Sequence, residues 1–212
     1  MRGAAVARPL LREPYVIAYS DEAVPQHVLF AEHSTGPRLR HARPRPGDWA
    51  HGVLRARQRT HRRGRPDFRA VNARRQWQCI GRGRCQICGR PARDPESGRV
   101  WWLLSEDGRS ADRGYTNAPP TCRACIPDAA AQCPHLRRSM AVYTAADFEP
   151  YGVLANLYEP CGALAVPVEQ GVELTLRDGL LGYALATQLL VVLHDLRPAP
   201  LPSAPPRGRA LP

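Results

Sequence analysis

The sequence predicts an α+β protein in which a small cysteine-rich module lies within a mixed frame of short strands and a C-terminal helix. Three observations support this class. Short runs of apolar and aromatic residues recur along the chain, two Cys-x-x-Cys pairs lie near its middle, and an apolar segment near the C-terminus has helical spacing. We expect four segments. They are N-terminal strands and a basic loop over 1–65, a helix plus the cysteine module over 66–140, C-terminal strands and a helix over 141–197, and a disordered proline-rich tail over 198–212.

The first segment contains two apolar runs, residues 15–19 and 27–32, separated by a polar stretch. This pattern predicts a pair of strands. Residues 36–47 contain prolines and glycines that oppose a helix, so we expect an extended loop there.

The second segment opens with a predicted helix. Pro66 suits a first helical turn, Phe68, Val71 and Trp77 supply an apolar stripe, and Gly81 ends the pattern. The apolar run at residues 99–104 predicts a strand, and the Glu-Asp-Gly sequence at 106–108 predicts a turn after it. A second helix is expected from the second cysteine pair to about Gln132, before Pro134.

The third segment has three strand candidates, residues 151–158, 163–168 and 172–176, with turn residues between them. Residues 180–196 are rich in leucine and predict a final helix. The positions near helical spacing are Leu181, Leu185, Leu189, Val192 and Leu196.

The chain is strongly basic, with a net charge of +11 and a pI near 10.0. Such a balance favours contact with polyanions such as nucleic acid. All 30 basic residues are arginine, in a chain rich in alanine and proline, so part of this excess reflects codon usage. Arginine nevertheless binds phosphate bidentately and stacks on bases in ways that lysine does not.

Residues 1–12 lack the apolar core of a secretory signal, and the longest apolar stretch is shorter than a membrane span. We therefore expect a cytoplasmic protein without a membrane partner. In a reducing compartment, cysteines with paired spacing favour metal ligation over disulfides.

The sequence Cys85-Gln86-Ile87-Cys88-Gly89 has the spacing of a metal-binding knuckle, and Cys122-Arg123-Ala124-Cys125 repeats it. Two such pairs complete a tetrahedral four-thiolate site, which predicts one structural zinc ion. Four buried cysteines without a metal are the alternative.

The other cysteines have alternative interpretations. Cys133 and His135 are either substitute ligands or a packed pair beside the site. We place Cys79 on the predicted helix and interpret Cys161 as a small buried residue in a turn.

A knuckle, a hairpin and a helix that carries the second pair resemble a treble-clef zinc module. Asn117, five residues before the second pair, also resembles the end of an HNH endonuclease motif. That family uses a histidine base between its cysteine pairs. Here the interval contains no histidine, and Ile126 follows the last cysteine where that family has another. Glu106, Asp107 and Asp112 are the acids that could bind magnesium there, although solvated acids in a turn are the simpler interpretation.

A wider pattern resembles uncharacterised cysteine-rich proteins of Streptomyces and related actinobacteria. The matching pieces are residues 64–68, 85–92, 102–104, 119–125 and 133–136. This resemblance implies a shared fold and a zinc site, but it implies no activity.

Arginines crowd before and beside the first cysteine pair and predict a phosphate-binding surface. The candidates are Arg55, Arg57, Arg59, Arg62, Arg63, Arg65, Arg74, Arg75, Arg82 and Arg84. Trp49, His61, Phe68 and Trp77 are candidate stacking surfaces. A solvated basic surface that pairs with the protein's own acids is the alternative.

These features favour a non-enzymatic, zinc-stabilised nucleic-acid-binding protein, regulatory or an accessory of a mobile element. We assign no catalytic residue. The second hypothesis is a protein-interaction adaptor that docks through the C-terminal helix, and the third is a degenerate HNH-type endonuclease.

Overall fold

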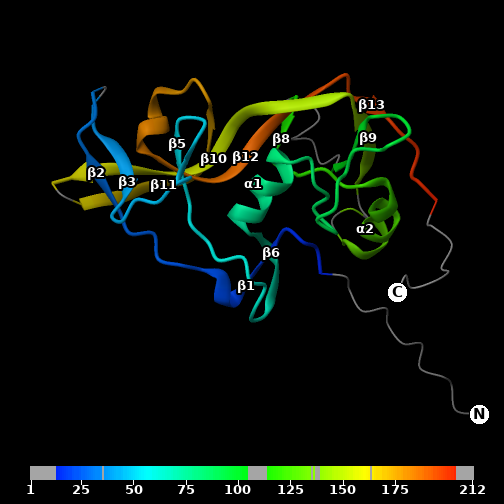
Figure 1. Ribbon diagram of the computed structural model, residues 1–212, viewed down its shortest axis with the longest axis horizontal. Coiled ribbons are helices and arrows are strands. Elements are labelled where there is room, and N and C mark those ends of the chain that lie inside the picture. The colour runs from blue at the N-terminus through cyan, green and yellow to red at the C-terminus, as the bar shows by residue number, and fades with distance from the viewer. Residues whose placement is uncertain are drawn as a thin grey trace, which may run out of the picture.

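The computed structural model describes residues 13–34, 36–104, 114–134, 136, 139–162 and 164–203. Strands dominate these ranges, with two short α-helices and three 3-10 helices between them. Figure 1 shows an elongated molecule in which long strands run along the horizontal axis. The predicted α+β class is therefore wrong, because the described chain is mainly β-structure.

The largest sheet has the strand order β11-β10-β12-β5-β4, and β8 also pairs with β12. Its neighbours are antiparallel except for β12 and β5, which run parallel. The strands are β4 (Trp49–Ala50), β5 (Val53–Arg55), β8 (Tyr115–Thr116), β10 (Asp147–Cys161), β11 (Leu164–Thr175) and β12 (Ala184–His194).

The predicted C-terminal helix at residues 180–196 is wrong. These residues fall in the 3-10 helix η3 (Gly179–Tyr183), strand β12 and the residues after it. Leu189, Leu190 and Val191 are all at most 3% exposed, which requires cover on both faces of the sheet. A strand buried on both faces has a continuous apolar run, and periodicity alone does not separate such a run from a buried helix.

The N-terminal strands form two small antiparallel sheets. Strand β1 (Ile17–Tyr19) pairs with β6 (Pro66–Val71), and β2 (Val28–Ala31) pairs with β3 (Arg38–His41). The two predicted strands exist, but they do not pair with each other, and β3 occupies part of the predicted extended loop.

The helix expected from Pro66 starts later, because residues 66–71 form β6. Helix α1 (Ala73–Gly81) begins after Asn72, whose side chain accepts a hydrogen bond from the Arg75 amide at 3.1 Å. Asparagine at this position satisfies one of the free amides of the first turn. The cap, and not the proline, therefore sets the start of the helix.

The third sheet has the order β13-β9-β7, with β7 (Val100–Leu104), β9 (Ala141–Ala145) and β13 (Arg197–Pro198). Strand β7 confirms the strand predicted at 99–104, while the predicted turn at 106–108 lies outside the described residues. Because β7 pairs with β9 and β8 pairs with β12, these two strands do not form the hairpin expected of a treble clef.

Helix α2 (Ile126–Gln132), which follows the 3-10 helix η2 (Arg123–Cys125), confirms the helix predicted after the second cysteine pair. Strand pairing crosses each expected segment boundary, and Pro198 of the predicted tail pairs with Tyr143.

Residues 1–12 and 204–212 lie outside the described residues. No helix in the described ranges has the length and apolar character needed to cross a membrane.

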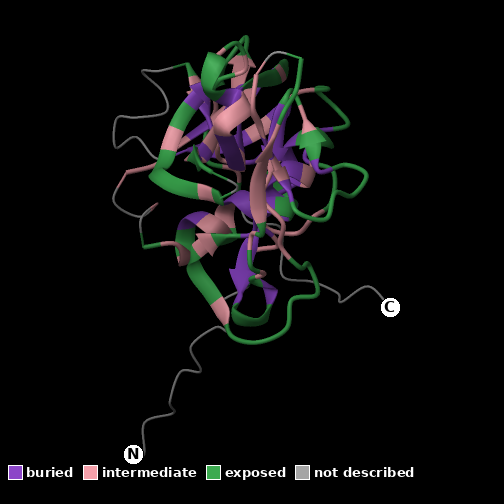
Figure 2. Ribbon diagram, turned by 90° about the vertical axis from the view of Figure 1, so that its left-hand side faces the viewer, coloured by how far each residue is buried: buried purple, intermediate pink, exposed green. Residues whose placement is uncertain are grey.

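Helix α1 packs against the middle of β12 through a buried glutamine. The Gln76 side-chain amide donates to the Leu189 carbonyl at 2.8 Å and accepts from the Leu189 amide at 2.9 Å. It thereby pairs with β12 as another strand would. Leu189 belongs to a core cluster that also includes Trp77, Ile80 and Trp102. Figure 2 shows buried segments in the interior of the molecule.

The other side of α1 is fixed by a buried ion pair with the 3-10 helix η1 (Ser20–Glu22). Arg75 contacts both carboxylate oxygens of Glu22, at 2.5 and 2.6 Å, and both side chains are at most 1% exposed. The carboxylate also accepts hydrogen bonds from the amides of Tyr19 and Arg62 and from the side chain of Asn72. Glu22 thus connects three separate parts of the chain.

We expect Glu22→Gln to lower the free energy of unfolding at pH 7 by about 3–5 kcal/mol, because it leaves the Arg75 charge buried without a counter-charge. Denaturant unfolding measures this change. Glu159→Gln, at an exposed position on β10, is the control and should change the stability little.

The pH dependence gives a second test of the Glu22–Arg75 pair. Burial raises the pKa of Glu22, but hydrogen bonds from Arg75, Arg62 and Asn72 outweigh it, so the pKa lies below the ordinary 4.5. The ion pair therefore makes its full contribution to the free energy of unfolding above pH 4.5, and this contribution is lost as the pH falls through the lowered pKa of Glu22. A difference between wild type and Glu22→Gln that persists undiminished at the lowest pH would contradict this account.

Candidate metal centre and arginine-lined cavity

The first cysteine pair lies in a tight turn directly after α1. The Cys85 amide donates to the Arg90 carbonyl and the Gly89 amide donates to the Cys85 carbonyl, both at 2.8 Å. The Ile87 amide points at the Cys85 sulfur at 3.3 Å. Gly89 has a φ of +73°, and a Cβ there would come within 3.2 Å of the Tyr15 ring, so the turn requires glycine.

The segment before the second pair is held against this turn by main-chain and side-chain hydrogen bonds. The Gln86 amide donates to the Pro120 carbonyl at 2.8 Å, and the Gln86 side chain donates to the Thr121 hydroxyl at 3.0 Å. The Thr121 amide in turn donates to the Trp101 carbonyl of β7 at 2.9 Å. Both cysteine pairs are therefore positioned by groups other than their own sulfurs.

The sulfur atoms of Cys85, Cys88, Cys122 and Cys125 all lie within 4.8 Å of one another. The Cys88 and Cys122 sulfurs are 3.8 Å apart, and none of the four cysteines is in a disulfide. Four sulfurs around a tetrahedral ion with metal–sulfur bonds of about 2.3 Å are about 3.8 Å apart. The cluster thus has the donor set and the spacing to hold one metal ion.

The short distances between the thiols of the cluster shift the pKa values of Cys85 and Cys125. Hydrogen bonds from Cys122 and Cys125 lower the pKa of Cys85, so its thiolate form is stabilised by its neighbours. Hydrogen bonding to Cys122 and Cys85, together with burial, raises the pKa of Cys125. A bound cation must displace the remaining protons, so its affinity increases with pH.

The other cysteines lie outside this cluster. Cys79 is buried on α1 and donates to the Cys85 carbonyl, and burial raises the pKa of its thiol to about 12. Cys133 caps α2 and is partly buried, while His135 lies outside the described residues. Cys161, expected to be buried, is exposed at the end of β10.

The HNH resemblance gains no support from the described residues. The Asn117 side-chain amide donates to the Gln188 side chain at 2.9 Å, and the main-chain carbonyl of Asn117 accepts from the Gln76 side chain. Asn117 therefore belongs to the contact between α1 and β12. The three acids considered as magnesium ligands lie within 105–113, outside the described residues.

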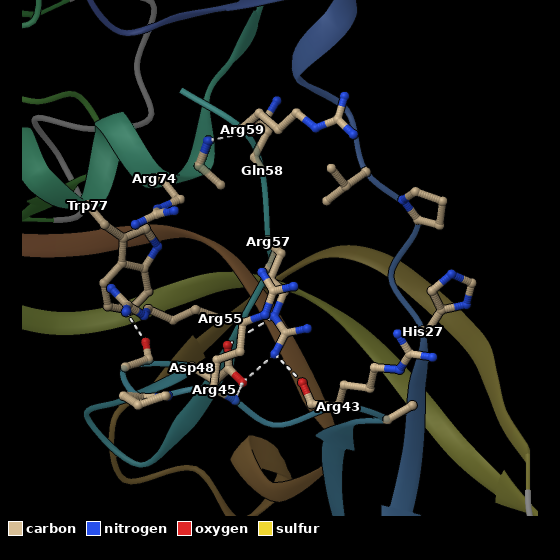
Figure 3. A pocket seen from close by; sticks show the side chains of 17 residues that line it. His27, Arg43, Arg45, Asp48, Arg55, Arg57, Gln58, Arg59, Arg74 and Trp77 are labelled. Carbon is tan, nitrogen blue, oxygen red and sulfur yellow. Dashed lines mark hydrogen bonds and ion pairs between the residues drawn. The ribbon is translucent and has the colours of Figure 1, made fainter. Parts of the chain in front are cut away.

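A second candidate site is a cavity of about 870 Å³ between residues 24–27, the loop that precedes β4, the chain that leaves β5, and the start of α1. Figure 3 shows side chains from these four segments around it. Its lining includes six arginines and one carboxylate, namely Arg43, Arg45, Arg55, Arg57, Arg59, Arg74 and Asp48.

Asp48 holds one of these arginines in place. Arg57 contacts both carboxylate oxygens, at 2.6 and 3.0 Å, and also donates to the Arg43 carbonyl at 2.7 Å. Arg55 donates to the Gly47 carbonyl and lies over the Trp77 ring, 5.5 Å from its centroid. The only carboxylate among the lining residues is therefore already paired.

The other four guanidinium groups, those of Arg43, Arg45, Arg59 and Arg74, have no hydrogen-bond or ion-pair partner within the described part of the chain. Burial, followed by the nearby charge of Arg74, lowers the pKa of Arg55. Like charges that converge on one cavity repel one another, so an anion there would be strongly favoured.

The predicted arginines do not form one surface. Arg55, Arg57, Arg59 and Arg74 line the cavity, together with Arg43 and Arg45, which the sequence-based selection missed. The sequence feature that could have identified Arg43 and Arg45 is the arginine-dense stretch that begins at residue 38, before the densest cluster of arginines.

The remaining candidates lie elsewhere. Arg62 donates to the Tyr19 hydroxyl at 2.7 Å, and Arg75 is buried against Glu22, which prevents contact with a ligand. Arg63 and Arg65 are exposed on the segment before β6. Arg82 lines a smaller cavity of about 330 Å³, and Arg84 is partly buried.

Comparisons of the chain with protein families, with curated proteins and with solved structures find no match.

We expect Cys88→Ser to abolish stoichiometric binding of cobalt, because a hydroxyl replaces one of the four thiolate donors. Titration with cobalt, followed by the absorbance of cobalt–thiolate bonds, measures this loss. Cys161→Ser, at an exposed position outside the cluster, is the control. Equal cobalt binding by both variants would show that the cluster is not the metal site.

Proposed function

We propose that this chain is a zinc-stabilised nucleic-acid-binding protein of the cytoplasm, with no catalytic role. The observation that carries the proposal is the cavity lined by six arginines and one already paired carboxylate. Zinc supports the fold, and the cavity contacts phosphate.

Zinc is the metal that best suits the cysteine cluster. Four thiolates in tetrahedral array are the usual donors of a structural zinc ion, and they leave no coordination position for water or substrate. The two cysteine pairs come from turns far apart in the sequence, so one ion cross-links the end of α1 to the start of α2. The binding energy of the ion then becomes part of the folding energy.

Phosphate is the anion that best suits the cavity. Guanidinium groups bind phosphate oxygens in pairs, and a phosphate backbone supplies negative charge at regular intervals. Arg59 and Arg74, whose guanidinium groups have no partner among the described residues, line this cavity from two different segments, and protein groups hold Arg55 and Arg57 in place. Contacts of this kind are independent of base sequence and weaken with salt.

The two alternative functions receive less support. Docking through a C-terminal helix fails because residues 184–194 form the largely buried strand β12. Nuclease activity of the HNH type lacks a histidine between the cysteine pairs, as the sequence itself shows.

We expect the purified protein to contain one zinc ion per chain, and removal of the ion to lower the unfolding temperature markedly. Elemental analysis and thermal unfolding, before and after chelation, measure both. Re-addition of zinc should restore the original curve. An unfolding curve that does not change on complete metal removal would contradict a structural role.

The double variant Arg59→Gln/Arg74→Gln should weaken nucleic-acid binding and reduce the log–log salt slope by about 1–2, because two phosphate contacts are lost. Fluorescence anisotropy with labelled single-stranded and duplex DNA and RNA across a salt series measures both quantities.

Arg177→Gln, which removes an exposed arginine outside the cavity, is the control for charge alone. If the double variant and this control lose the same amount of nucleic-acid affinity per charge removed, the cavity is not a specific phosphate site. The absence of binding to every nucleic acid at low salt would overturn the proposed function.

A further inference from the structure

A basic arm, residues 59–71, leaves the arginine-lined cavity and returns to it. The arm begins at Arg59, which lines the cavity, and ends next to Asn72, the cap of α1. The Asn72 side chain donates to the Arg59 carbonyl at 2.8 Å and closes the base of the arm. Both ends of the arm therefore adjoin the cavity.

The main chain of the arm is held in place by the segment around η1. The Arg62 amide donates to the Glu22 carboxylate at 2.9 Å, and the Ser20 amide donates to the Arg65 carbonyl at 3.0 Å. Gly64 has a φ of +88°, and a Cβ there would lie 2.1 Å from the Ser20 hydroxyl. The main chain of the arm is thus fixed in shape, while Arg63, Arg65, Phe68 and Arg69 on it are exposed.

Phe68 is an exposed aromatic residue of this arm. It is 52% exposed, and the exposed Arg63, Arg65 and Arg69 lie near it in the chain. An aromatic ring among cations is suited to stack on a base while the cations contact the adjoining phosphates.

The other aromatic candidates are less available for stacking. Trp77 is only 7% exposed in the cavity wall, with His51 stacked on it at 6.1 Å. Trp49 has the Arg38 guanidinium over its ring at 4.3 Å. The imidazole of His61, on the same arm, accepts a hydrogen bond from the Arg63 amide at 3.2 Å. Phe68 is therefore the ring on which an incoming base can stack without displacing a protein group.

The form of the cavity distinguishes single strands from duplexes. A volume of about 870 Å³ lies in the range that accommodates a small organic ligand, comparable to a nucleotide. A duplex is stiff and keeps its bases stacked inside, so it follows the walls of a recess less well than a flexible strand does, and its bases cannot reach Phe68. A flexible single strand meets neither restriction.

We infer that the cavity and the basic arm form one site for single-stranded nucleic acid, with phosphate in the cavity and an unpaired base on Phe68. This inference rests on the proposed function and specifies its ligand. The site binds single strands of DNA or RNA more tightly than the duplex of the same length.

The test compares wild type, Phe68→Ala and Phe68→Tyr by anisotropy, with single-stranded and duplex oligonucleotides of equal length. Phe68→Ala should weaken single-strand binding by about fivefold or more, the effect of one lost base stack. Phe68→Tyr keeps the ring and should retain wild-type affinity. Because the side chain is exposed, all three proteins should have the same thermal unfolding curve.

Duplex binding should be weaker than single-strand binding and insensitive to Phe68→Ala. Equal or tighter duplex binding, or an unchanged single-strand affinity in Phe68→Ala, would overturn this inference while the proposed function stands. Failure of both the single strand and the duplex to bind would instead overturn the proposed function.

Discussion

The buried ion pair between Glu22 and Arg75 is the contact on which the arrangement of this protein depends. A buried carboxylate is costly unless its charge and its lone pairs are satisfied. Here Arg75 supplies the charge, and amide groups of Tyr19, Arg62 and Asn72 supply further donors. The pair therefore fixes the N-terminal segment, the basic arm and the start of α1 relative to one another.

Helix α1 connects this ion pair to both candidate sites. Gln76 anchors it on β12, so its neighbours Arg74 and Trp77 face the cavity. The end of the same helix leads into the turn of Cys85, with the Arg84 amide donating to the Cys79 carbonyl at 2.7 Å. A short helix thus positions one wall of the cavity and one half of the metal site.

The cysteine cluster could be predicted from the sequence, because the spacing of Cys85 and Cys88 encodes a local turn and Cys122 and Cys125 repeat that spacing. The β12 strand could not. Its apolar run fits a buried helix as well as a strand, and only its pairing with β10 and β5, set by distant residues, separates the two. The roles of the arginines were also not predictable one by one, since Arg74 and its neighbour Arg75 face a cavity and a buried carboxylate respectively.

Amide hydrogen exchange of the full zinc-loaded chain tests whether nucleic acid binds in the arginine-lined cavity. The measurement compares exchange with and without a saturating single-stranded oligonucleotide. We expect slower exchange in the segments that contain the cavity-lining residues, 24–27, 42–48, 55–59 and 73–77, and unchanged exchange in β11 at the far edge of the sheet. Slower exchange confined to β10 and β11, with none around the cavity, would contradict binding in the cavity.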